Sequence, residues 1–85
     1  MYIRDRDHYL CQACLNNVDG RGIRYTTSDL EVHHIVPLSE DYERRLDEDN
    51  LITLCREHHE QAEEGLLSRA ALHELAMKSA ASVGV

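Results

Sequence analysis

Three cysteines and one histidine are spaced as ligands of a single metal ion. Residues 11–14 read CQAC and residues 55–58 read CREH, so two donor pairs have the same two-residue gap. Such a gap lets a tight turn or the first turn of a helix aim both donors at one ion, and three cysteines with one histidine are a common structural zinc set. We therefore predict that Cys11, Cys14, Cys55 and His58 bind structural Zn²⁺.

Two other interpretations of the cysteines compete with zinc binding. A CxxC can be a redox pair, and buried cysteines can fill a core as small apolar side chains. The redox hypothesis expects a thioredoxin-like βαβ context, and the core hypothesis does not explain a second pair at the same spacing. Three cysteines cannot all pair in disulfides within one chain, and the sequence does not open with the charged and then apolar residues of a signal peptide. We therefore do not expect a secreted disulfide scaffold.

Further histidines lie between and beside these pairs. Residues 32–37 read VHHIVP, fifteen residues separate His34 from Asn50, and eight separate Asn50 from His59. Together with the two ligand pairs, this order resembles the HNH endonucleases over residues 11–59, and is most similar to compact zinc-bearing members from phages and bacteria. One departure is His58, because these members usually have cysteine there.

The resemblance implies the fold and the chemistry. The fold would be α+β, the small ββα-metal (His-Me finger) fold, with a two-stranded antiparallel hairpin packed on a helix, flanking helices and a structural zinc. The activity would be metal-dependent hydrolysis of DNA phosphodiester bonds, by nicking or double-strand cleavage. An imidazole titrates near pH 6.5, which suits a general base at neutral pH.

Each residue of the pattern receives a role from the resemblance. His34 would be the general base, and His33 and His59 would hold a catalytic divalent metal such as Mg²⁺, Mn²⁺ or Ni²⁺. Adjacent strand residues face opposite ways, so His33 and His34 must lie at a strand end or a bulge to share a site. Asn50 would hold the hairpin backbone or the base imidazole in orientation; alternatively it only caps a helix.

Two ligand assignments stay open at this point. His58 and His59 lie three and four residues after Cys55, so either shares a helical face with it and could close the zinc site. Glu63 lies four residues after His59 and could be a third ligand of the catalytic metal. We favour the alternative that Glu63 is a solvated surface acid.

The charge distribution bears on DNA binding. Nine Lys plus Arg against sixteen Asp plus Glu give a net charge of −7, with six acids within residues 40–49, so a generic nucleic-acid-binding module is not expected. The first candidates for phosphate contacts are Arg21 and Arg24 near the hairpin. The secondary candidates are Arg4, Arg6, Arg56 and Arg69.

So few contacts predict weak, nonspecific DNA binding, and selectivity would then come from a partner. The resemblance suggests phage terminase or another targeting protein. The alternative function is a zinc-stabilised nucleic-acid or protein adaptor that keeps the fold and does not cleave. No apolar run is long enough for a transmembrane helix, and the resemblance implies the cytoplasm of a bacterium or phage-infected cell.

The elements that must position these residues follow from the local patterns. We expect one HNH nuclease domain over residues 1–85, with the zinc and catalytic core in 11–65. A short helix would lead into Cys11, strands would occupy 23–27 and 30–36, and a helix would run from Asn50 to Gly65. Because 85 residues bury little apolar surface, zinc would supply much of the folding free energy.

A last helix is predicted at about residues 68–80, capped by Ser68, with a frayed tail from Ser79. Its apolar residues recur at three and four positions, so they would cover the core or form a dimer. These residues are Leu67, Ala71, Leu72 and Leu75.

Overall fold

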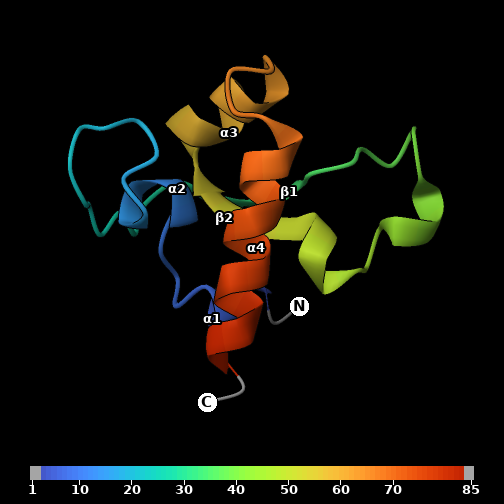
Figure 1. Ribbon diagram of the computed structural model, residues 1–85, viewed down its shortest axis with the longest axis horizontal. Helices are drawn as coiled ribbons and strands as arrows, with labels where there is room; N and C mark the ends of the chain where they lie inside the picture. The colour runs from blue at the N-terminus through green and yellow to red at the C-terminus, as the bar shows by residue number, and fades with distance from the viewer. Residues whose placement is uncertain (1–2, 84–85) are drawn as a thin grey trace.

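The fold is a two-stranded sheet surrounded by helices. The computed structural model describes residues 3–83. Its elements are α1 (Ile3–Arg6), α2 (Gln12–Leu15), β1 (Leu30–His34), two 3₁₀ turns, η1 (Tyr42–Arg44) and η2 (Glu48–Asn50), β2 (Leu51–Cys55), α3 (Arg56–Glu63) and α4 (Arg69–Val83) (Figure 1). The strands are antiparallel, with Leu30 opposite Cys55 and His34 opposite Leu51. The predicted α+β class, with a hairpin and flanking helices, is confirmed.

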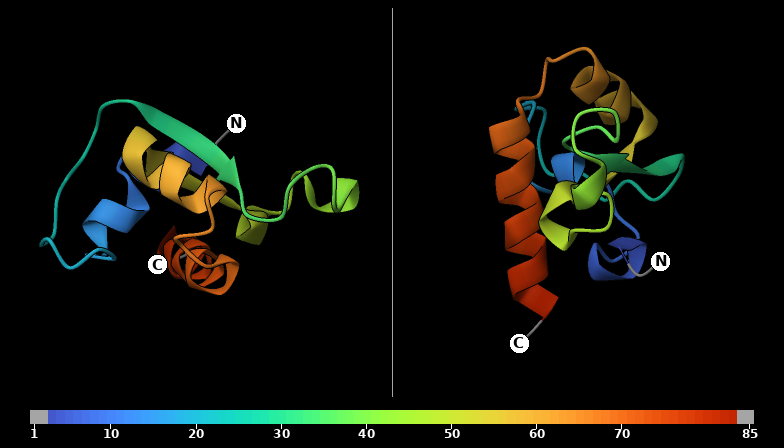
Figure 2. Two further views of the ribbon diagram at one scale, coloured as in Figure 1. Left: turned by 90° about the horizontal axis from the view of Figure 1, so that it is seen from above. Right: turned by 90° about the vertical axis from the view of Figure 1, so that its right-hand side faces the viewer.

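Strand β2 is the centre of the molecule. All five of its residues are buried, and it contacts α1, α2, α3 and α4 as well as β1. Figure 2 shows α4 and β1 on opposite sides of the molecule. The run Leu-Ile-Thr-Leu-Cys supplies apolar side chains to both faces of the sheet, which is the pattern of a fully buried strand.

The positions of the predicted elements need two corrections. Residues 23–27 are not a strand, and Leu51–Cys55 is strand β2 rather than the start of a helix, so the predicted helix is shortened to α3. A short apolar run fits a buried strand as well as a buried helix, because burial on both faces removes the alternation that distinguishes them. The segment at 22–27 is tied instead to α2, since the Arg24 N–H donates to the Cys14 carbonyl at 3.0 Å.

A buried ion pair connects the N-terminal segment to the sheet. Arg6 and Asp7 are 3% and 0% exposed, and Arg6 Nε lies 2.8 Å from Asp7 Oδ1. Arg6 also donates to the Leu51 carbonyl at 2.7 Å, and Asp7 accepts from the Thr53 N–H at 2.8 Å. Hydrogen bonds on both sides of the pair offset the cost of removing two charges from water.

Helix α4 covers the core, as its apolar spacing predicts. The Ser68 hydroxyl accepts from the Ala71 N–H at 3.1 Å, which confirms the predicted cap. The side chains packed into or against the core are those of Leu67, Leu72, Leu75 and Ala76. The predicted fraying from Ser79 is wrong for the described residues, because α4 continues to Val83 and Ser79 is buried beside Asp7; residues 84–85 lie outside them.

None of the helices within residues 3–83 is long and apolar enough to cross a membrane.

Candidate metal centres and active site

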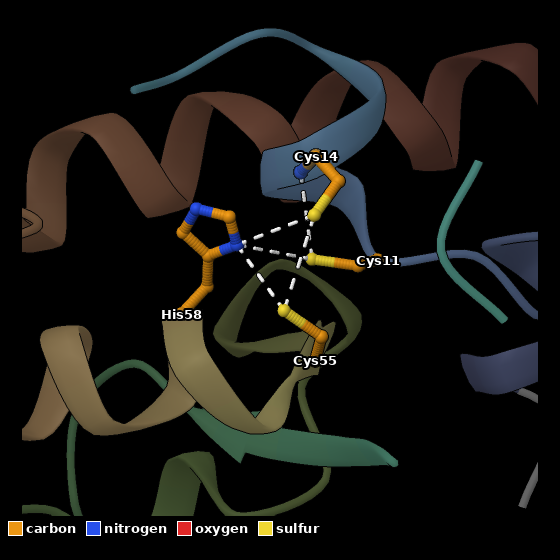
Figure 3. Close-up of side chains that lie close together, drawn as sticks. All are labelled: Cys11, Cys14, Cys55 and His58. Atoms are coloured by element: carbon orange, nitrogen blue, oxygen red, sulfur yellow. Dashed lines mark hydrogen bonds between the residues drawn. The ribbon is translucent and has the colours of Figure 1, made fainter. Parts of the chain in front are cut away.

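Four donors converge where α2 meets the start of α3. Cys11 precedes α2 and Cys14 lies within it, while Cys55 ends β2 and His58 lies in the first turn of α3 (Figure 3). The His58 Nδ1 atom lies 3.6, 3.4 and 3.3 Å from the Sγ atoms of Cys11, Cys14 and Cys55. The Sγ atoms of Cys14 and Cys55 lie 3.9 Å apart.

These distances fit a tetrahedral zinc site. Zinc bonds of about 2.3 Å to sulfur and about 2.0 Å to nitrogen imply separations of about 3.8 Å between sulfurs and about 3.5 Å between sulfur and nitrogen. Burial raises the pKa of the Cys11 thiol to about 12, so this group is a thiolate at neutral pH only beside a cation. The Cys₃His cluster can therefore bind zinc through Nδ1 of His58.

The second imidazole nitrogen of His58 contacts a residue that the sequence did not reveal. The Nε2 atom lies 3.0 Å from Asp19 Oδ2. Hydrogen bonds from Arg21, and then from Arg24 and His58, hold the pKa of the Asp19 carboxyl well below its usual range. Asp19 sits in a turn-rich loop, and its partner depends on how that loop folds back onto α3.

A second group of donors lies on the other side of α3. His33 of β1 and His59 and Glu63 of α3 place their ligand atoms within 4.8 Å of one another. The rings of His33 and His59 meet edge to face, with centroids 5.0 Å apart, and Glu63 lies 3.2 Å from His59 Nε2. The three residues line a hollow of about 340 Å³ together with His34 and Pro37. Two imidazoles and a carboxylate are donors that a divalent cation accepts.

The environment of this group favours neutral, oriented imidazoles. Burial, and then the proximity of His59, lower the pKa of His33, so its ring is neutral and can donate a lone pair at pH 7. The Nδ1 atom of His59 contacts the Glu31 carboxylate. Glu31 stands two residues before His33, on the same face of β1, so strand alternation could have identified it.

His34 is the last residue of β1 and lines the same hollow as His33. The register with β2 runs without interruption from Leu30 to His34, so the end of the strand, rather than a bulge, lets neighbouring histidines reach one hollow. The His34 Nε2 atom lies 3.1 Å from the Arg45 carbonyl oxygen. A carbonyl only accepts, so this hydrogen bond leaves the proton on Nε2 and the lone pair on Nδ1.

Asn50 closes the loop between the strands. It is 1% exposed, and its Oδ1 accepts from the Val36 N–H at 2.8 Å. Its Nδ2 donates to the carbonyls of Val36 and Arg44 at 3.2 and 3.1 Å. Because α3 begins only at Arg56, the alternative that Asn50 caps this helix is wrong; its side chain holds the loop backbone.

The two arginines predicted to contact phosphates form ion pairs with acidic side chains. Arg21 and Arg24 line a hollow of about 620 Å³ together with Arg56. Asp19 Oδ2 lies 2.8 Å from Arg21 Nη2 and 2.6 Å from Arg24 Nη2, and Arg21 also contacts Glu57.

One secondary candidate is removed by the fold. Arg6 is buried in its pair with Asp7, so it is unavailable to DNA. The prediction for Arg6 is therefore wrong, because its guanidinium donates hydrogen bonds to the carbonyls of Glu48 in η2 and Leu51 at the start of β2.

A comparison with protein-family models gives a match described as HNH endonuclease, over residues 11–65. Searches among curated proteins and solved structures gave no match. The matched span contains both donor clusters, the histidine at the end of β1 and the buried asparagine.

Proposed function

The chain belongs to the HNH endonuclease family, and from this premise we propose that it hydrolyses DNA phosphodiester bonds, cutting one or both strands, with His34 as general base. The observation that carries this proposal is the hollow in which His34 lies beside the donor group of His33, His59 and Glu63. A base and a cation site on one surface are what hydrolysis of a phosphodiester requires.

The donor group would hold one divalent cation. Two imidazole nitrogens and one carboxylate oxygen suit Mn²⁺ or Ni²⁺ as well as Mg²⁺. When bound there, the cation would supply charge stabilisation at the phosphate and the leaving oxygen. The Glu31 carboxylate contacts His59 Nδ1; a proton held on that nitrogen would leave the lone pair of Nε2, which faces Glu63, for the cation.

His34 would take the proton from the attacking water at Nδ1. Its ring is held by the Arg45 carbonyl at 3.1 Å, and a positioned base of this kind contributes about 10²- to 10⁴-fold. Asn50 acts on the same geometry through the backbone, because it holds the carbonyl of Arg44, the residue before Arg45. Asn50 is therefore a positioning residue in this proposal.

DNA would lie over the hairpin and α3, with Arg21 and Arg24 as phosphate contacts. Both guanidiniums already pair with Asp19, so a phosphate must compete with a carboxylate. This supports weak, nonspecific binding with a shallow salt dependence, since each of the few phosphate contacts contributes about −0.9 to the log–log salt slope on B-DNA. Selectivity would then depend on a targeting protein such as phage terminase, which co-purification would test.

The test is relaxation of supercoiled plasmid by the zinc-loaded protein with Mg²⁺, Mn²⁺ or Ni²⁺. We expect nicking by the wild type and a loss of about 10²-fold or more in His34→Ala. The control is His8→Asn, an exposed histidine outside the hollow with a φ of 58° that asparagine tolerates. Absence of nicking by the wild type with each of the three metals would favour the adaptor function, and an active His34→Ala would exclude His34 as the base.

Separate substitutions test the roles of the two adjacent histidines. His58 is fully buried with Nδ1 facing three thiols, so His58→Ala should lose zinc and folding. His59 is half-buried beside His33, so His59→Ala should keep its circular dichroism and zinc and lose cleavage. The same phenotype in both variants would contradict the assignment.

A further inference from the structure

We propose that Asp19 is a positioning residue for the zinc site, holding the His58 imidazole in the orientation and tautomer that bind zinc through Nδ1. The proposal starts from one contact, the 3.0 Å separation of His58 Nε2 and Asp19 Oδ2. The proposal depends on the zinc site and not on DNA cleavage. Its test measures zinc affinity, so the result is independent of whether the protein is a nuclease.

An imidazole ligand needs a partner that a thiolate does not. Neutral histidine carries one ring proton, so binding through Nδ1 requires that proton on Nε2. The His58 side chain is 0% exposed, and a buried N–H without an acceptor is costly. A carboxylate on the outer nitrogen satisfies this donor, fixes the ring plane and raises the basicity of the ligating nitrogen.

The Asp19 carboxylate is itself held in place. Arg24 Nη2 lies 2.6 Å from Oδ2, Arg21 Nε lies 2.9 Å from it, and the Arg21 N–H donates to Oδ1 at 3.1 Å. Hydrogen bonds from two arginines thus fix the position of the carboxylate beside His58. With only 15% of its side chain exposed, Asp19 is a fixed acceptor rather than a mobile surface acid.

The loop that carries Asp19 is bent to reach α3. Asn17, Gly20 and Gly22 have φ angles of 53°, 75° and 100°, a left-handed region that glycine and asparagine occupy at low cost. The Gly22 N–H also donates to Asn17 Oδ1 at 2.7 Å, which closes the loop on itself. The segment between the two halves of the zinc set is thus shaped to bring one carboxylate to the outer face of His58.

The first measurement is zinc affinity by competition with a chromophoric chelator. We expect Asp19→Asn to weaken zinc binding about 10- to 100-fold, and Asp19→Ala at least as much because it also removes the acceptor oxygen. The matched control is Asp29→Asn, which removes the same charge from an exposed acid lining the neighbouring hollow. Equal affinities in Asp19→Asn and Asp29→Asn would overturn the proposal.

A double-mutant cycle with His58→Cys separates positioning from other effects. A thiolate at position 58 has no outer nitrogen, so Asp19→Asn should leave zinc affinity unchanged in that background. If Asp19 acted only by pairing with Arg21 and Arg24 or through its charge, the loss would be the same in both backgrounds, and the proposal would be wrong.

The cycle also covers the case in which Asp19→Asn fails to fold. Folding of the Asp19→Asn variant restored by His58→Cys with zinc supports the proposal, and failure to fold in both backgrounds overturns it. A third readout is the His58 Nε2 proton in zinc-loaded protein, observed by NMR. It should be protected from exchange in the wild type and exchange faster in Asp19→Ala.

Discussion

Replacing Asn50 by alanine tests whether one buried amide holds the loop that follows His34. The substitution removes an acceptor for the Val36 N–H and two donors to the carbonyls of Val36 and Arg44. Val36 lies two residues after His34, and Arg44 immediately precedes Arg45, whose carbonyl contacts the His34 ring. Both ends of the loop would lose their common anchor.

The expected cost follows from these three hydrogen bonds. Each contributes about 0.5–1.5 kcal/mol net, and more where a buried partner is left unpaired. Val36 and Arg44 are half-buried, so water reaches part of the loop, and the sum is about 2–4 kcal/mol. For a domain of this size each kcal/mol lowers the melting temperature by about 4–8 °C.

The assay is urea unfolding of the zinc-loaded protein, with plasmid nicking measured where both proteins are folded. The control is Asn16→Ala, which removes a half-buried amide that donates to one carbonyl, that of Gln12, at 2.8 Å and accepts from Lys78 at the surface, so it should cost only about 1 kcal/mol. Asn50→Asp keeps the acceptor for Val36 but points a carboxylate at two carbonyls, so it should be no better tolerated than alanine. An Asn50→Ala variant within about 0.5 kcal/mol of the wild type would refute the reasoning.

Three further predictions concern metal and buried charge. Removing zinc with a strong chelator should abolish the helical circular dichroism, since structural zinc contributes about 10–16 kcal/mol of apparent binding free energy; an unchanged spectrum and melting temperature would contradict this. Asp7→Ala leaves the Arg6 guanidinium buried and unpaired, so unfolding measurements should show a loss of about 3–5 kcal/mol. Glu63→Gln should weaken Mn²⁺ binding about tenfold or more by calorimetry, whereas Glu60→Gln, on the exposed side of α3, should not.

The zinc set was predictable from the sequence because its information is local. Two donors two residues apart are brought together by the turn or helix that contains them, so only the meeting of the pairs needed the fold. Glu31 was predictable in principle for the same reason, since it is two residues from His33 on one strand. In contrast, Asp19 reaches His58 only after a loop with several left-handed residues folds back, and no spacing rule encodes that contact.

The second strand was misassigned for a physical reason. Leu51–Cys55 is buried on both faces, so its apolar run carries no alternation, and a helix that follows directly at Arg56 extends the apparent helical pattern backwards. The more strand-like segment at 23–27, rich in β-branched and aromatic residues, lies outside the sheet because its backbone bonds to the α2 region. Residues 23–27 and 51–55 have similar strand propensity, and the burial of 51–55, which the sequence alone does not reveal, determines that this segment forms the strand.

The same burial explains how Asn50 comes to matter although its side-chain hydrogen bonds go to the loop backbone rather than to a histidine. An asparagine at the boundary between η2 and β2 is carried into the interior by the buried strand that follows it. There its amide must be satisfied, and it bonds to the N–H and carbonyl of Val36 and to the carbonyl of Arg44, all in the loop that follows His34. The strand that completes the sheet therefore also anchors the loop whose Arg45 carbonyl contacts His34, so sheet formation and the orientation of the proposed base depend on one another.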